Sequence, residues 1–185
     1  MVPMSATSGR FVVRINPDLH RQLVEDGRRT NQSLNAVCVE RLSRVTDLTS
    51  DYLAAWRVPY GTDLVGIVLF GSVARGEARA DSDADVLFVL RSARAPVRSD
   101  YHAFDALPHA VRRFQGHEVS PHVVRLPFSP LEVGSLWLEV ALDGVVLWEE
   151  ERLVSETLRA LRLLMANGDV RRNEAGGHSY WTWTR

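Results

Sequence analysis

Two carboxylates at alternating positions, Asp83 and Asp85, stand at the start of an apolar run, residues 86–90, that has the composition of a buried strand. Because side chains alternate along a strand, both carboxylates are expected on one face. Oxygen ligands at this spacing suit a hard divalent cation such as Mg²⁺, which usually reaches a protein through one or two carboxylates and substrate phosphates. The pair therefore predicts a metal site that takes a phosphate-bearing substrate.

A glycine-serine turn precedes these acids and is predicted to hold the phosphates. An apolar strand, residues 65–70, ends abruptly at Gly71 and Ser72, and glycine lets a backbone approach another group closely. The serine hydroxyl and the nearby backbone amides can hold phosphate oxygens. Arg75 follows in the same turn and is expected to neutralise phosphate charge.

The compound motif Gly71-Ser72-Val73-Ala74-Arg75-Gly76 and Ser82-Asp83-Ala84-Asp85 is similar to that of polymerase-beta-like nucleotidyltransferases, and most to the minimal nucleotidyltransferases. The resemblance extends from about residue 48 to residue 150. It implies two Mg²⁺ ions that align ATP or another nucleoside triphosphate for in-line attack by a hydroxyl. By the resemblance, Asp83 and Asp85 are catalytic metal ligands, and Gly71, Ser72 and Arg75 bind the nucleotide.

The third carboxylate that the resemblance implies is missing from its expected place. The corresponding strand is predicted over residues 118–125, and the expected position falls near Ser120. Glu118 shares that face and lies about 7 Å away along the strand, so it is the candidate substitute. His117 and His122 lack the spacing of a metal site and are interpreted as surface or hydrogen-bonded residues. Transfer and nucleotide binding without transfer therefore both stay open.

Composition narrows the reaction classes. All 22 residues counted as Lys or Arg are arginine, which excludes mechanisms that need a lysine nucleophile or a phosphate-loop lysine. The single cysteine, Cys38, excludes an internal disulfide and a cysteine-based zinc site. The net charge of −1 is uneven, with +3 on residues 1–46, −6 on residues 47–150 and +2 on residues 151–185.

The basic first segment predicts a strand and two helices. Residues 10–16 are rich in β-branched residues, Asn16 and Pro17 have the order of a helix cap and first turn, and Ser33 is a second cap. About 37 residues of this kind have too little core to stand alone. A symmetric homodimer that pairs the two strands is therefore expected.

This order resembles the ribbon-helix-helix family, which includes HicB- and Arc-like antitoxin-type repressors, over about a fifth of the chain. The resemblance implies that a two-stranded ribbon enters the major groove of operator DNA. Arg10, Val12 and Arg14 would then contact bases, and Ser33 would hold a phosphate at the amino end of the second helix. The alternative is a segment that only dimerises the protein.

The predicted fold class is α+β, with three parts. A ribbon-helix-helix segment covers residues 1–46, a nucleotidyltransferase-type α/β domain covers 47–150, and a helix with a β-hairpin covers 151–185. The basic hairpin resembles a winged-helix wing, although packing of Tyr180, Trp181 and Trp183 against the preceding helix is favoured over contact with nucleic acid or a partner. No stretch approaches the roughly 20 apolar residues of a membrane helix, so a cytoplasmic protein without a membrane partner is expected.

Three functions fit these features. The first is an antitoxin-like regulator that binds operator DNA and transfers a nucleotide, with AMP suggested by the resemblance, to a HEPN-type toxin encoded nearby. The second is a repressor or antitoxin whose transferase-like domain is inactive and only binds a partner. The third, the least favoured, is a nucleotidyltransferase for a small molecule such as an aminoglycoside.

Overall fold

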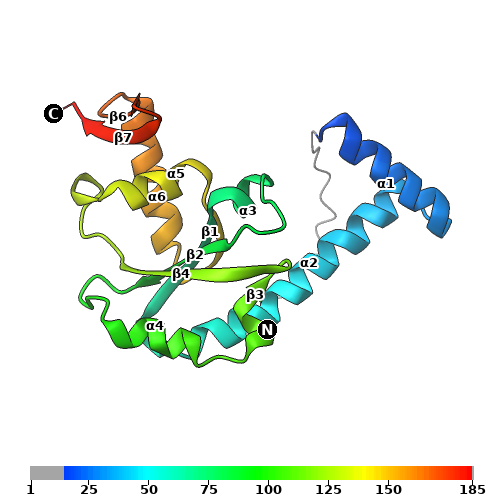
Figure 1. Cartoon of the computed structure of the whole chain (residues 1–185), viewed down its shortest axis with the longest axis horizontal. Coiled ribbons are helices and arrows are strands. Elements are labelled where there is room, and N and C mark those ends of the chain that lie inside the picture. The colour runs from blue at the N-terminus through cyan, green and yellow to red at the C-terminus, as the bar shows by residue number, and fades with distance from the viewer. Residues whose placement is uncertain (1–14, 185) are drawn as a thin grey trace, which may run out of the picture. The chain divides into compact units, whose positions relative to one another are not determined.

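The computed structural model describes residues 15–184, with side chains described outside residues 40–51. The chain divides into two compact units, Met1–Leu48 and Thr49–Arg185. Helices and strands are mixed through the described residues, as the α+β class requires (Figure 1). The boundaries after residues 46 and 150 remain predictions. No helix within the described residues combines the length and apolar character needed to cross a bilayer.

Two capped helices make up the described part of the first unit. Helix α1 (Pro17–Thr30) starts where Asn16 accepts a hydrogen bond from the Leu19 amide at 2.8 Å. It ends at Asn31, whose φ of 56° is left-handed. Ser33 Oγ accepts from the Ala36 amide at 3.1 Å and caps the second helix. Both predicted helix starts are confirmed, whereas the predicted strand and its Arg10, Val12 and Arg14 lie outside the described residues.

Helix α2 (Leu34–Arg57) is a single helix of 24 residues. The domain boundary that the sequence predicted after residue 46 falls inside this helix. No glycine or proline lies between residues 34 and 57, so nothing in the sequence ends the helix until Pro59.

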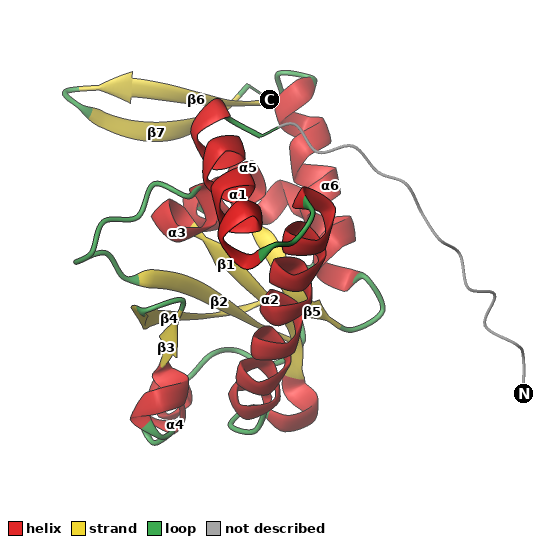
Figure 2. Ribbon diagram, turned by 90° about the vertical axis from the view of Figure 1, so that its right-hand side faces the viewer, coloured by secondary structure: helices red, strands yellow, loops and turns green. Residues whose placement is uncertain are grey.

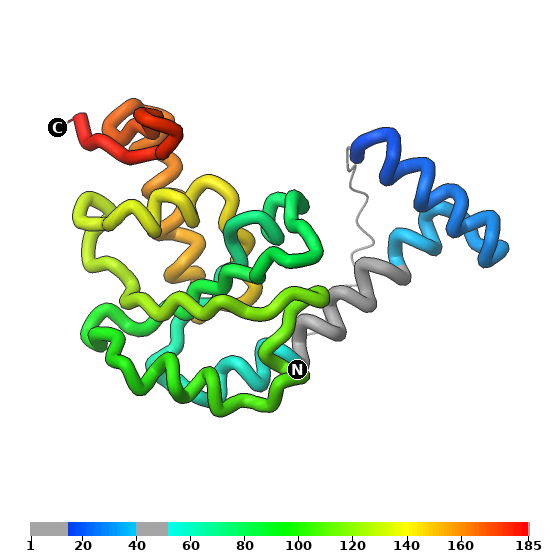
Figure 3. Tube along the Cα trace, viewed as in Figure 1, coloured from blue at the N-terminus to red at the C-terminus, as the bar shows by residue number. Residues whose placement is uncertain are grey.

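A five-stranded mixed sheet forms the second unit, with the strand order β3-β4-β2-β1-β5. Strand β1 is antiparallel to both β2 and β5, β3 is antiparallel to β4, and β2 is parallel to β4. The crossover from β2 to β4 passes through helix α4 (Arg98–Asp105), which can be followed in Figure 3. The strands are β1 (Leu64–Phe70), β2 (Ala84–Leu90), β3 (Arg113–Phe114), β4 (His117–Arg125) and β5 (Val145–Glu149).

Both faces of this sheet are covered. Helices α5 (Ser135–Asp143) and α6 (Leu153–Ala166) pack on one face against a buried apolar cluster that includes Leu87. Trp56, at the end of α2, and Phe104 of α4 pack on the other face around Phe88. All seven residues of β1 are buried, which explains its continuous apolar sequence.

The C-terminal hairpin is a separate two-stranded sheet, β6 (Val170–Ala175) and β7 (His178–Trp183), as Figure 2 shows. Trp181 Nε1 donates to Glu139 of α5 at 2.8 Å, and Arg172 pairs with the same carboxylate at 3.2 Å. Trp181 and Trp183 pack, partly buried, against the core that contains α5 and α6. The expected packing of the hairpin aromatics is confirmed for these two tryptophans, whereas Tyr180 is 47% exposed.

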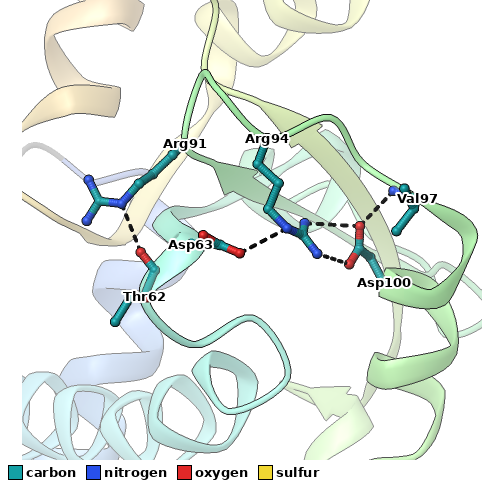
Figure 4. A network of polar contacts seen from close by, with 6 residues as sticks. All are labelled: Thr62, Asp63, Arg91, Arg94, Val97 and Asp100. Carbon is teal, nitrogen blue, oxygen red and sulfur yellow. Dashed lines mark hydrogen bonds and ion pairs between the residues drawn. The ribbon is translucent and has the colours of Figure 1, made fainter.

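An ion pair at the start of α4 fixes the crossover (Figure 4). Asp100 is buried, and its carboxylate accepts from both terminal nitrogens of Arg94, at 2.5 and 3.1 Å, and from the Val97 amide at 2.8 Å. The Arg94 hydrogen bonds hold the pKa of Asp100 below its usual range. Arg94 also pairs with Asp63, 3.0 Å away, just before β1. The loop after β2 is thereby tied to the beginning of β1.

Candidate nucleotide and metal site

The predicted phosphate turn is a short helix, α3 (Gly71–Arg75), between β1 and β2. Gly71 has a φ of 73°, a conformation that favours glycine. A Cβ at Gly71 would clash with Oδ2 of Asp85 and lie 3.4 Å from its Cγ. The register explains this contact, because Asp85 pairs with Phe70, the residue before the turn. The close backbone approach expected at this glycine is made by the Asp85 carboxylate.

Asp83 and Asp85 flank buried Ala84, the first residue of β2. Asp83 is exposed and makes no hydrogen bond or ion pair with the described residues. The Asp85 side chain is 33% exposed. His117 of β4 contacts the Ser82 carbonyl through Nδ1 at 2.8 Å and so holds the backbone just before Asp83. The two carboxylates are therefore open to an external ligand.

Ser120, near the position where the resemblance implies a third acid, lies beside the acidic pair. In the parallel pairing of β2 with β4, Asp85 lies opposite Ser120. Glu118 shares the face of Ser120 but is paired elsewhere: its carboxylate lies 2.8 Å from Arg113 and 3.3 Å from His109. The catalytic role expected of Glu118 stays a prediction, and these two contacts compete with it.

His122 is a site residue whose role the sequence did not indicate. Its Nε2 lies 3.4 Å from Asp85 Oδ1 and 3.5 Å from Ser120 Oγ. The Phe70 ring packs against the imidazole in an edge-on arrangement, with centroids 5.2 Å apart. The signal was present in the alternation of β4, because His122 lies two residues after Ser120, on the same face. This alternation indicates a position near Asp85 only when β4 is known to pair with β2.

Arg75 is bound within the protein. Its Nε donates to Glu77 at 2.7 Å and its Nη1 to Asp143 at 2.5 Å, which ties α3 to the end of α5. These hydrogen bonds, first from Glu77 and then from Asp143, raise the pKa of the Arg75 guanidinium. The expected contact of Arg75 with a nucleotide remains a prediction. A phosphate would have to compete with the Glu77 and Asp143 carboxylates for this guanidinium.

The donor set suits a divalent cation that is shared with a substrate. Within the described residues, no three His, Cys, Asp or Glu side chains converge tightly enough to hold a metal alone. Two carboxylates completed by phosphate oxygens are, however, the usual protein environment of Mg²⁺. Asp83 and Asp85 therefore fit one shared cation, whereas the serine opposite Asp85 leaves a second ion with fewer charged ligands.

Ser33, the predicted phosphate contact of the first unit, lies exposed at the amino end of α2. Its hydroxyl already serves as the helix cap. The DNA-contact roles of Ser33 and of the three strand residues remain predictions.

Comparison with protein families gives two matches on separate parts of the chain. Residues 55–136 match the model of the nucleotidyltransferase domain, and residues 2–42 match that of the HicB family. A search of curated proteins found no match.

Several solved structures share a low overall similarity with the chain. A toxin–antitoxin with AMP-PNP is 20% identical over 63% of this chain and 90% of its own, with a TM-score of 0.43. A tri-AMPylated Shewanella oneidensis HEPN toxin in complex with MNT antitoxin gives 16% identity, 66% and 91% coverage, and a TM-score of 0.39. The family matches show that part of the second unit is similar to the nucleotidyltransferase domain and that the N-terminal segment is similar to the HicB family.

Proposed function

We propose that the protein is an antitoxin-type DNA-binding regulator of the cytoplasm whose second unit transfers a nucleotide, AMP by the resemblance, to a partner toxin. The contact between Asp85 and the Gly71 backbone carries this proposal, because it joins the glycine turn to the acidic pair within the segment that matches the nucleotidyltransferase domain. The HicB-family match supports the antitoxin part.

In the proposed reaction, a hydroxyl oxygen of the toxin forms a bond to the α-phosphorus of a nucleoside triphosphate. The bond from that phosphorus to the bridging oxygen breaks, pyrophosphate leaves, and the hydroxyl proton passes to a base or to solvent. A divalent cation, Mg²⁺ by the resemblance, would neutralise the phosphates. Asp83 and Asp85 would hold that cation, and the start of α3 would receive the phosphates.

Co-expression with the product of the neighbouring gene tests this function. Because the two carboxylates are the proposed ligands, we expect a nucleotide-sized gain in the intact mass of that product, and no gain with Asp83→Asn/Asp85→Asn. Asp81→Asn is the matched control, since it removes an exposed carboxylate from the same loop and should keep the gain. A gain that survives the double substitution would place the chemistry elsewhere.

A binding-only domain is the second candidate, favoured by Ser120 opposite Asp85 and by the engagement of Glu118 with Arg113. In that case the partner would co-purify with an unchanged mass.

The DNA-binding part is tested with the DNA upstream of the protein's own gene. Since arginines that enter a DNA groove displace condensed counterions, Arg10→Ala/Arg14→Ala should weaken binding and flatten its dependence on salt by about one to two units of slope. Arg21→Ala/Arg29→Ala removes the same charge from α1, where each arginine pairs with an aspartate, and is the matched control. Equal salt slopes for wild type and the first variant would leave the segment as a dimerisation element.

A further inference from the structure

His122 and Asp85 present two donor atoms toward one point. The imidazole Nε2 and the carboxylate Oδ1 are 3.4 Å apart, which exceeds the roughly 2.7–2.9 Å of a charge-assisted hydrogen bond. Two ligand atoms that each lie about 2.1 Å from a shared cation are separated by about 3.0 Å at a right angle and about 3.4 Å at a tetrahedral angle. The observed separation is that of a long hydrogen bond, and it also lies at the upper end of the range for two ligands of one cation.

The surroundings of His122 hold its ring in this position while leaving it accessible. Phe70 packs edge-on against the imidazole, and the side chain of His122 is 37% exposed. Ser120 Oγ, 3.5 Å from Nε2, adds a neutral oxygen where a third acid was expected. Compared with a site of three carboxylates, this edge of the sheet has a neutral serine oxygen in place of one carboxylate and an additional imidazole nitrogen.

We propose that His122 is a direct ligand of the cation bound at Asp85, so that the site prefers a nitrogen-accepting first-row transition cation such as Mn²⁺ over Mg²⁺. Nitrogen-containing sites bind first-row transition cations with an affinity that rises along the series from Mn²⁺, the weakest of them, whereas Mg²⁺ takes oxygen ligands almost exclusively. The inference rests on the proposed nucleotidyl-transfer site and specifies the metal that it selects. Asp83 and the triphosphate complete the coordination, since the described side chains hold no metal cluster of three by themselves.

The test uses the full chain with Mn²⁺ and the β,γ-imido analogue of ATP. In protein labelled with ¹⁵N-histidine, pulsed electron paramagnetic resonance should show coupling of Mn²⁺ to one ¹⁵N nucleus. Labelling separates a histidine nitrogen from the nitrogens of the nucleotide base. The coupling should disappear in His122→Gln, which keeps a hydrogen-bond donor of similar size, and persist in His102→Ala, which removes an exposed histidine of α4.

Competition between Mn²⁺ and Mg²⁺ for the site gives a second measurement. A histidine with only a structural role would leave the relative affinity for the two cations unchanged. We expect the wild type to bind Mn²⁺ at least about tenfold more tightly than Mg²⁺ and His122→Gln to lose this preference, since even outer partners of metal ligands are worth 10- to 100-fold in affinity. Circular dichroism shows whether the His122→Gln variant is folded. If it is not, the ¹⁵N coupling in the labelled wild type tests the inference without the variant. Mn²⁺ bound with nucleotide but without ¹⁵N coupling overturns the inference and leaves the proposed function standing. If neither cation binds with or without nucleotide, both fail.

Discussion

Gly71→Ala is expected to lower the rate of nucleotidyl transfer by about 100-fold, because a Cβ at this position would clash with Oδ2 of Asp85 and displace the proposed metal ligand. A displacement on the order of 1 Å in a reacting constellation is enough for an effect of this size. The φ of 73° adds about 1–3 kcal/mol of backbone strain. The measurement is the single-turnover rate on the purified partner, beside the free energy of unfolding.

Gly76→Ala separates the clash from the strain. Gly76 has a nearly equal φ of 70°, yet a Cβ there would meet no atom within 4 Å. This control should lose similar stability and keep its transfer rate within about threefold, a small effect beside the 100-fold expected of a misplaced ligand. Parallel rate losses in both variants would mean that strain in α3, rather than the position of Asp85, limits the reaction.

Trp56→Ala should reduce the free energy of unfolding of the second unit by about 3–5 kcal/mol. Trp56 has no exposed surface and packs against the rings of Phe88, Phe104 and Phe114, at centroid distances of 5.9, 6.4 and 5.8 Å. Chemical denaturation followed by circular dichroism measures the change.

Trp56→Phe tests how that loss divides between packing and hydrogen bonding. The indole Nε1 donates to the Val111 carbonyl at 2.6 Å, and phenylalanine keeps most of the apolar volume but not this donor. A loss of about 1–3 kcal/mol is expected for the unpaired carbonyl and the reduced ring. Losses within 1 kcal/mol of wild type for both substitutions would show that the cluster around Trp56 contributes little to folding.

The local pattern of the chain was enough to predict much of the second unit. The unbroken apolar residues of β1 and the acidic start of β2 indicated both strands, and Gly71 indicated a close backbone approach. The resemblance alone placed the third-acid position near Ser120, and the structure shows Ser120 opposite Asp85. These features depend on alternation and on turn residues, which act over a few positions.

Features that depend on long-range pairing could not be predicted. His122 lies 37 positions after Asp85 in the chain, and its contact appears only when β4 lies parallel to β2. Arg75 looked like a free cation because Asp143, its partner on α5, is 68 positions away. The boundary predicted after residue 46 falls within helix α2, which has no glycine or proline to end it.

The parallel pairing of β2 with β4 also bears on the order in which the site assembles during folding. The contact between Gly71 and Asp85 belongs to an antiparallel β1–β2 pair whose strands are close in sequence. His122 and Ser120 arrive on a strand that must first close the long loop through α4, at a larger cost in chain entropy. Contacts of large sequence separation slow folding. We therefore expect a chain emerging from the ribosome to form the turn at Gly71 and its acids before it positions the imidazole, so that the proposed metal site is completed late in folding.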